Sequence, residues 1–286
     1  MSRMKLPFVL AKRFVAGETF EESIPKAKYL NHKNLKLTLD LLGENVSDKE
    51  TADATVDEYI NLLNGINEHG LISSISIKLT MMGLDIDREY CVENLYKLLD
   101  VAKKHDQFVN IDMEGSDYTQ VTIDIFKDAF AKYGQSVGTV IQAMMHRSKE
   151  DIEELASIGA NVRLVKGAYK ESPDVAILSM PEIRKAYKEQ AKILLDKTER
   201  PRFGTHDDEL VNWLREYTAA ENIAKDRLEF QMLYGLREET MVDLTKLGYL
   251  TRVYVPFGTD WFPYFSRRLM ERKENVWFVL STMLKK

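Results

Sequence analysis

Charged and polar side chains recur at the ends of short apolar segments along this chain of 286 residues. Polar and apolar residues alternate within most of these segments, as Ser76 and Lys78 alternate with Ile75 and Ile77. Such alternation separates the two faces of a strand, and here one face is unexpectedly polar. The polar residues at or near the C-terminal ends of the segments are Lys78, Asp112, Gln142, Arg163, Thr205, Gln231 and Tyr254. Because charged side chains are rarely fully buried without partners, this set predicts a binding site.

Eight segments rich in Val, Ile, Leu and Phe carry these residues, and amphipathic stretches separate them. In one such stretch, residues 182–196, apolar residues recur every three or four positions, which predicts a helix. Alternating strands and helices are typical of repeated βαβ units. The predicted strands are 36–40, 74–78, 108–112, 138–142, 161–165, 202–205, 228–231 and 252–255. A glycine precedes four of the predicted strands, at Gly70, Gly134, Gly159 and Gly248. Glycine readily adopts the positive φ angle that is common where a helix ends.

These elements predict an α/β fold, a TIM-type (β/α)8 barrel, formed by residues 36–286 as a single domain. Residues 1–35 would form a helical extension packed on the barrel. If helices cover the apolar faces of the strands, the polar faces point into the barrel. The polar set is then either a structural ion-pair network or a ligand site at the C-terminal ends of the strands, and we favour the ligand site.

The composition is that of a globular protein, with 44% hydrophobic and 30% charged residues. No apolar run approaches the roughly 20 residues that a membrane-spanning helix needs. Residues 1–18 lack the pattern of a signal peptide, and the single cysteine, Cys91, fits a reducing compartment. We therefore expect a cytoplasmic protein. A net charge of −5 without a block of basic residues gives no indication of nucleic-acid binding.

Common cofactor and catalytic motifs are absent from the sequence. It contains neither the glycine-rich fingerprint of a Rossmann dinucleotide site nor a Walker loop. The histidines at positions 32, 69, 105, 146 and 206 lack the spacing of metal ligands, and we predict no metal site. The nucleophile elbow of acyl-transfer enzymes is also missing.

An ordered set of sequence pieces at the predicted strand ends resembles the proline dehydrogenase family. The pieces are LDLLGE (39–44), SIKL (76–79), NIDME (110–114), RLVKGAY (163–169), GTHD (204–207), EFQML (229–233), and RVY (252–254) followed by SRRLME (266–271). The resemblance covers residues 13–286 and implies a distorted barrel with a final helix over its mouth. It also implies a short, monofunctional enzyme that uses FAD to oxidise L-proline to pyrroline-5-carboxylate.

For the substrate, the resemblance assigns Arg267, Arg268 and Lys78 to the proline carboxylate. A guanidinium suits this role because its planar fork can hold two oxygens at once. We expect Asp112 to pair with Lys78 across neighbouring strands, either as a base or to orient the lysine. The residues that would pack against the proline ring are Tyr254, Leu233 and Tyr169.

For the cofactor, the resemblance places Arg163 opposite flavin N5, where a fixed positive charge would stabilise the reduced ring. Gln142 would hydrogen-bond the edge of the ring. The residues assigned to the remainder of FAD are Val165, Lys166, Gly167, Ala168, Thr205, His206 and Glu271.

Glu44 and Arg267 follow the first and the eighth strand, which are neighbours in a closed barrel. We therefore expect these residues to form a gate, an ion pair that closes the pocket until the proline carboxylate replaces Glu44.

The resemblance implies that electrons pass to a membrane quinone during peripheral contact with the inner face of the membrane. It also implies pyrroline-5-carboxylate dehydrogenase as a downstream partner.

Two other functions fit the same residues. One is a Schiff-base aldolase built on Lys78, and the other is a non-enzymatic barrel that binds a small amino acid.

Overall fold

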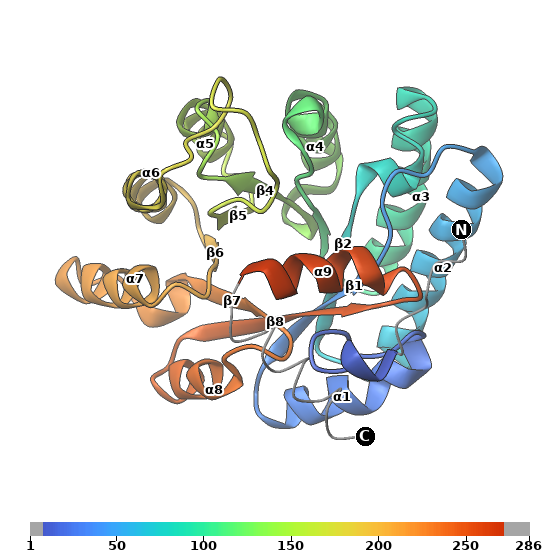
Figure 1. Cartoon of the computed structure of the whole chain (residues 1–286), viewed down its shortest axis with the longest axis horizontal. Helices are drawn as coiled ribbons and strands as arrows, with labels where there is room; N and C mark the ends of the chain where they lie inside the picture. The colour runs from blue at the N-terminus through green and yellow to red at the C-terminus, as the bar shows by residue number, and fades with distance from the viewer. Residues whose placement is uncertain (1–7, 272–286) are drawn as a thin grey trace.

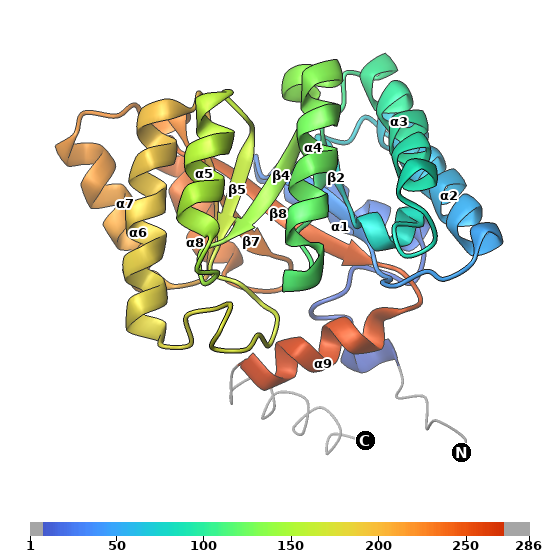
Figure 2. The same ribbon diagram turned by 90° about the horizontal axis from the view of Figure 1, so that it is seen from above.

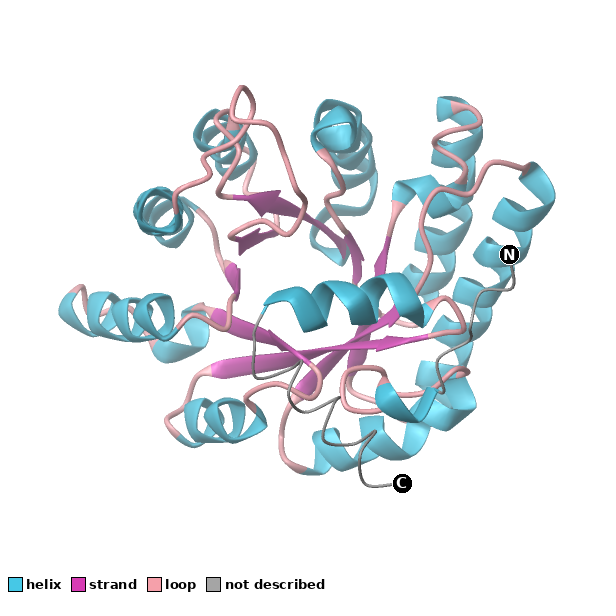
Figure 3. Cartoon of the chain, viewed as in Figure 1, coloured by secondary structure: helices cyan, strands magenta, loops and turns pink. Residues whose placement is uncertain are grey.

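The computed structural model describes residues 8–271, which form a closed barrel of parallel strands surrounded by helices (Figures 1 and 3). Each strand pairs with the next one in the sequence, and β8 pairs with β1 to close the barrel. The strands are β1 (Lys36–Leu41), β2 (Ser73–Ile77), β3 (Val109–Ile111), β4 (Val137–Gln142), β5 (Val162–Val165), β6 (Arg202–Gly204), β7 (Glu229–Leu233) and β8 (Leu250–Phe257). The predicted (β/α)8 barrel is confirmed.

Helices cover the outside of the barrel, and one helix crosses its mouth. The helices are α1 (Phe20–His32), α2 (Lys49–Glu68), α3 (Arg88–Lys104), α4 (Thr119–Tyr133), α5 (Ser148–Ser157), α6 (Met180–Lys197), α7 (Asp208–Ala220), α8 (Glu238–Lys246) and α9 (Trp261–Glu271). α1 precedes the first strand, and α9 lies across the barrel in Figure 1 and apart from the outer helices in Figure 2. Between residues 8 and 271, no helix has the length and apolar character required to cross a bilayer.

Every predicted strand segment contains a strand, and the boundaries differ by a few residues. The largest difference is in β8, which extends beyond the predicted segment 252–255 at both ends. It pairs with β1 as far as Phe257, so the partner strand prolongs it past the residues whose alternation is visible in the sequence. The four glycines expected at helix ends all have positive φ angles, between 58° and 94°.

The interior of the barrel contains two layers of side chains. The layer nearer to the N-terminal ends of the strands is a closed network around Arg252. Its Nε lies 2.7 Å from Glu229 Oε1, and its Nη1 donates to the Leu37 carbonyl at 2.6 Å and to Ser74 Oγ at 3.0 Å. The ion-pair network considered from the sequence therefore exists in this lower layer. The layer above it lines a cavity.

Arg202 also belongs to the lower layer, and Gly138 in β4 makes room for it. A Cβ atom at Gly138 would overlap the guanidinium of Arg202, whose Nη2 donates to the Asn161 carbonyl at 3.0 Å. Burial, together with the nearby charge of Arg163, lowers the pKa of Arg202. The concentration of arginines in the interior favours an anionic ligand in the cavity above them.

Candidate active site

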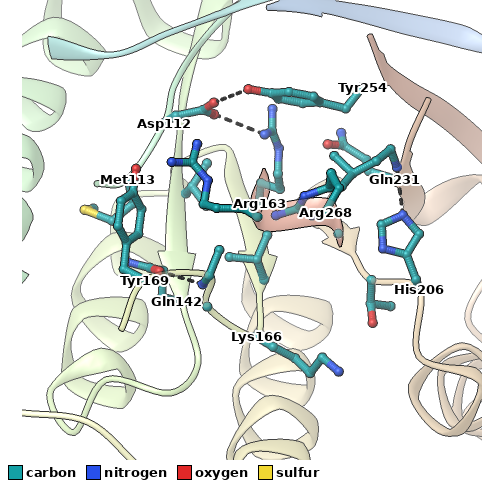
Figure 4. A pocket seen from close by; sticks show the side chains of 18 of the residues that line it. Asp112, Met113, Gln142, Arg163, Lys166, Tyr169, His206, Gln231, Tyr254 and Arg268 are labelled. Carbon is teal, nitrogen blue, oxygen red and sulfur yellow. Dashed lines mark hydrogen bonds and ion pairs between the residues drawn. The ribbon is translucent and has the colours of Figure 1, made fainter. Parts of the chain in front are cut away.

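A cavity of about 790 Å³ opens at the C-terminal ends of the strands (Figure 4). This volume is in the range of sites that enclose a drug-sized ligand. Residues of α9, among them Tyr264, Arg267 and Arg268, line part of it. The structure brings together at this cavity all the sequence-predicted site residues whose side chains it describes: Glu44, Lys78, Asp112, Gln142, Arg163, Val165, Lys166, Gly167, Ala168, Tyr169, Thr205, His206, Leu233, Tyr254, Arg267 and Arg268. The side chain of Glu271 lies outside the described part of the chain.

Asp112 lines this cavity and accepts hydrogen bonds from several side chains of the barrel interior. Its Oδ1 accepts from Ser76 Oγ at 2.6 Å, from Asn110 Nδ2 at 2.9 Å and from Arg163 Nη1 at 3.1 Å. Its Oδ2 accepts from Tyr254 OH at 2.6 Å. Figure 4 shows the tyrosine and the arginine converging on the carboxylate. With its oxygens occupied in this way, Asp112 is better suited to orienting its neighbours than to accepting a proton from a ligand.

Lys78 pairs with Asp40, and the expected pairing of Lys78 with Asp112 is wrong. Lys78 Nζ lies 3.2 Å from Asp40 Oδ1, and both side chains are buried. Asp40 is aligned with Ser76 in the register of β1 and β2, so it reaches Lys78 from the adjacent strand. Sequence reasoning gave no role to Asp40, although it ends its strand on the polar face as Lys78 and Asp112 do.

The charge of Lys78 is fixed by its surroundings. Burial opposes the ammonium, but the attraction of Asp40, with that of Asp112, outweighs burial and raises the pKa of Lys78. At Asp40, burial and the charge of Asp112 outweigh the attraction of Lys78, and its pKa is raised to about 6. A Schiff-base lysine must lose its proton near neutral pH, so the raised pKa of Lys78 argues against the aldolase function. A permanent ammonium suits a ligand carboxylate instead.

Arg267 reaches the edge of the cavity from α9 and pairs with Glu44. Its Nη2 lies 3.0 Å from Glu44 Oε1, and both side chains are partly exposed. Arg268 is buried in the cavity wall, where its Cζ lies 5.2 Å from the centre of the Tyr264 ring. The two arginines assigned to the carboxylate therefore differ, because one is in an ion pair at the rim and the other is held in the wall.

One nitrogen of the Arg163 guanidinium has no partner in the described part of the chain. Its Nη1 donates to Asp112 and its Nη2 donates to Ser76 Oγ at 3.3 Å, but within residues 8–271 its buried Nε has no hydrogen-bond partner. Buried donors are almost always satisfied, so a ligand group is expected there. Gln142 is held by two bonds, from Nε2 to the Glu114 carbonyl at 2.9 Å and from the Ala168 amide to Oε1 at 3.3 Å.

Lys166 lies in a cluster of charges at the rim of the cavity, near the N-terminus of α7. Asp207 Oδ2 accepts from Lys166 Nζ at 2.9 Å and from Arg184 Nε at 2.8 Å. These contacts outweigh burial and lower the pKa of Asp207 to about 2. Sequence reasoning missed Asp207, which stands in the quoted GTHD piece, and Arg184, which carries no signal beyond its place in a helix. Gly167 has a φ of 125°, a conformation that favours glycine, and a Cβ there would also overlap the side chain of Met144.

Thr205 and His206 both make local hydrogen bonds. Thr205 Oγ1 accepts from the Asp207 amide at 3.1 Å, and His206 Nε2 accepts from the Leu233 amide at 2.9 Å (Figure 4). The second bond requires His206 Nε2 to be unprotonated, and it fixes the ring between β6 and β7.

Comparisons with known proteins point to one family. The family model for proline dehydrogenase matches residues 23–281. The chain is 42% identical to proline dehydrogenase 2 of Bacillus subtilis over 97% of its own length and 91% of that protein. It is 34% identical to the proline dehydrogenase of Deinococcus radiodurans, over 100% of its length and 93% of that protein.

A solved structure shows the same fold. Proline utilization A from Bdellovibrio bacteriovorus, inactivated by N-propargylglycine, superimposes with a TM-score of 0.85 and 27% identity over 92% of the chain. The match spans about a third of that longer protein (33%). The family model, the two relatives and the barrel agree, and the chain therefore belongs to the proline dehydrogenase family, with the dehydrogenation of proline as its activity.

Proposed function

We propose that the chain binds FAD in this cavity and oxidises L-proline to pyrroline-5-carboxylate, the first step of proline catabolism to glutamate. The observation that carries the proposal is Arg163, a buried guanidinium at the cavity whose Nε has no partner in the described part of the chain. When bound, FAD supplies at N5 the acceptor for the hydride that leaves proline C5. A guanidinium anchored by Asp112 and Ser76 is a preorganised donor for the negative charge that then develops.

The positions of the cations at the cavity support separate regions for the proline carboxylate and for the cofactor phosphates. Lys78, Arg267 and Arg268 hold the proline carboxylate, with Lys78 as a permanent point charge and the arginines as planar donors. Lys166, whose Nζ lies 2.9 Å from Asp207 Oδ2, meets the phosphates of the cofactor. Gln142, fixed by Glu114 and Ala168, contacts the flavin edge.

The walls of the site position the proline ring. The ring of Tyr254 is held by Asp112, and Leu233 and Tyr169 provide apolar contact beside it. Carboxylate binding fixes one end of proline while these side chains orient its C5 atom, which is the kind of alignment that lowers the barrier to transfer.

We further propose that a membrane quinone takes the electrons and that pyrroline-5-carboxylate dehydrogenase takes the product. Both proposals rest on the family and on relatives such as the bifunctional PutA protein of Escherichia coli, which is 29% identical over 95% of the chain. They imply a cytoplasmic protein that contacts the membrane peripherally.

The absorption spectrum of the purified protein tests the proposed function. We expect the bands of an oxidised flavin, bleached by proline without added reductant. A coloured protein that proline fails to bleach would contradict the proposed reaction. A colourless protein that borohydride traps with a carbonyl substrate would support the aldolase, and proline binding without any chromophore would support an amino-acid sensor.

A further inference from the structure

Residues 8–17, which we call the strap, lie on the mouth side of the barrel next to α9 (Figure 2). The strap and α9 share a hydrophobic cluster that is separate from the main core of the barrel. The members of this cluster are Phe8, Ala11, Phe14 and Val15 of the strap, Trp261, Tyr264 and Phe265 of α9, and Leu42 and Leu236. The apolar side of α9 therefore packs on the strap.

Aromatic contacts hold the two segments together. The ring of Phe14 is fully buried, and its centre lies 6.3 Å from that of Phe265. The rings of Phe8 and Trp261 are 5.7 Å apart, and Trp261 Nε1 donates to Glu18 Oε1 at 3.2 Å, just beyond the strap. Removal of the Phe14 ring would leave a cavity directly behind the helix.

The path of the strap is fixed at its other side by backbone contacts. The Ala16 amide donates to the Pro256 carbonyl at 2.8 Å, and the Gly258 amide donates to the Gly17 carbonyl at 3.0 Å, both at the end of β8. A Cβ at Gly235, which has a φ of 75°, would overlap the carbonyl oxygen of Arg13. The strap thus packs closely against the loop that follows β7.

The opposite side of α9 reaches the active site. Tyr264, which packs in the cluster, also lines the cavity and lies under the guanidinium of Arg268. Phe265, the partner of Phe14, precedes Arg267 by two residues. One short helix therefore has its apolar residues on the strap and its arginines at the cavity.

We propose that the strap, through Phe14, positions α9 so that Arg267 and Arg268 meet the substrate carboxylate. Phe14 does not line the cavity, and its described aromatic contact is with Phe265, so it is a positioning residue. This inference rests on the proposed function. An error of about 1 Å in the position of a binding group can lower activity roughly a hundredfold, so a displaced α9 weakens the carboxylate site while the flavin site on β4 to β6 is left intact.

The test compares three holoenzyme variants. Phe14→Ala removes the contact with Phe265, and Gly235→Ala pushes the strap from its other side without touching α9. The control is Phe126→Ala, which truncates an equally buried ring in α4, away from the cavity. We expect the first two variants to raise the KM for proline about ten- to a hundredfold with little change in kcat and flavin content, and the control to leave the KM unchanged.

A second measurement separates positioning from general damage. In an Arg267→Ala background, Phe14→Ala should raise the KM less than it does in the wild type, because one of the arginines that it positions is gone. If Phe14→Ala does not fold, Phe14→Leu gives the smaller cavity and an intermediate KM. Equal KM values in the strap variants and the control, or additive effects with Arg267→Ala, would overturn the inference. A wild-type protein that proline does not reduce would instead overturn the proposed function.

Discussion

Tyr254 and Asp112 are joined across the barrel interior by a hydrogen bond of 2.6 Å between the phenol and Oδ2. The bond holds the tyrosine ring next to Arg163, whose Cζ lies 5.3 Å from the ring centre. Burial and the charge of Asp112 raise the pKa of Tyr254, so the phenol keeps its proton and remains the donor. The ring is thus fixed between a carboxylate and a guanidinium at the place where the substrate ring is proposed to bind.

Tyr254→Phe should keep the turnover of proline within about tenfold while the rejection of 4-hydroxyproline is relaxed. The phenol occupies space beside the substrate ring, and a site discriminates best where an added hydroxyl meets a fixed group. The measurement is the ratio of kcat/KM for the two substrates. Tyr249→Phe, at a buried tyrosine outside the cavity, is the control. A ratio that is the same in wild type and Tyr254→Phe would argue against a contact between Tyr254 and the substrate.

Arg163→Ala should slow flavin reduction by proline about 10²- to 10³-fold and weaken retention of the cofactor, because a preorganised donor is lost. Arg163→Lys keeps the positive charge but loses the planar guanidinium that binds Asp112 and Ser76. Its rate of flavin reduction should lie between those of the wild type and Arg163→Ala. Stopped-flow reduction at matched flavin occupancy gives the comparison. If Arg163→Ala is reduced as fast as the wild type, this arginine has no role at the flavin.

The ion pair between Glu44 and Arg267 should act as a gate that the substrate carboxylate opens. Glu44→Ala should leave proline binding similar or slightly tighter and make the flavin more reactive with sulfite. Arg267→Ala should raise the KM for proline, at a cost of about 2 to 5 kcal/mol, since the carboxylate is left underpaired. Sulfite reactivity in the single and double variants measures their coupling. Additive effects would show that the contact has no part in closing the pocket.

Acid should destabilise the protein partly through Glu229. Burial disfavours this carboxylate, but the charge and hydrogen bonds of Arg252 outweigh burial and lower its pKa from 4.5 to about 2. A carboxyl with a lowered pKa in the folded state contributes stability that is present above its unfolded value and lost as the pH falls through its folded value. The difference corresponds to about 3 kcal/mol.

Urea unfolding across the acid range checks this contribution. Glu229→Gln should be less stable than the wild type near neutral pH, because the Arg252 charge is left unbalanced. The difference in unfolding free energy should narrow as the pH falls from about 4.5 toward 2. A gap that stays constant over this range would show that the stability does not depend on ionised Glu229.

Much of the barrel was predictable because the sequence pattern of each strand depends only on residues within that strand. Alternation within a strand, as at Ser76 to Lys78, follows from the period of the backbone and needs no knowledge of neighbours. The cavity residues were predictable for a related reason, since the C-terminal ends of parallel strands meet at one end of a barrel.

The pairing of charges was not predictable in the same way. Lys78 pairs with Asp40 and Asp112 with Arg163, a choice set by strand register and side-chain reach, which the sequence alone does not reveal. Arg184 enters the cavity wall from a helix, where no periodic signal separates it from a surface arginine. The packing of α9 on residues 8–17 joins opposite ends of the described chain, and the helical spacing of Trp261, Tyr264 and Phe265 does not reveal which segment covers their face.

The sealed lower layer of the barrel interior has a consequence for the order of events in catalysis. Arg252, Glu229 and Ser74 occupy the interior away from the cavity, so we expect ligands to approach from the C-terminal ends of the strands, where the cavity opens. The amino acid and any electron acceptor must then use the same entrance. Under this arrangement the product leaves before the acceptor arrives, and initial-rate plots at several acceptor concentrations should give the parallel lines of a ping-pong reaction.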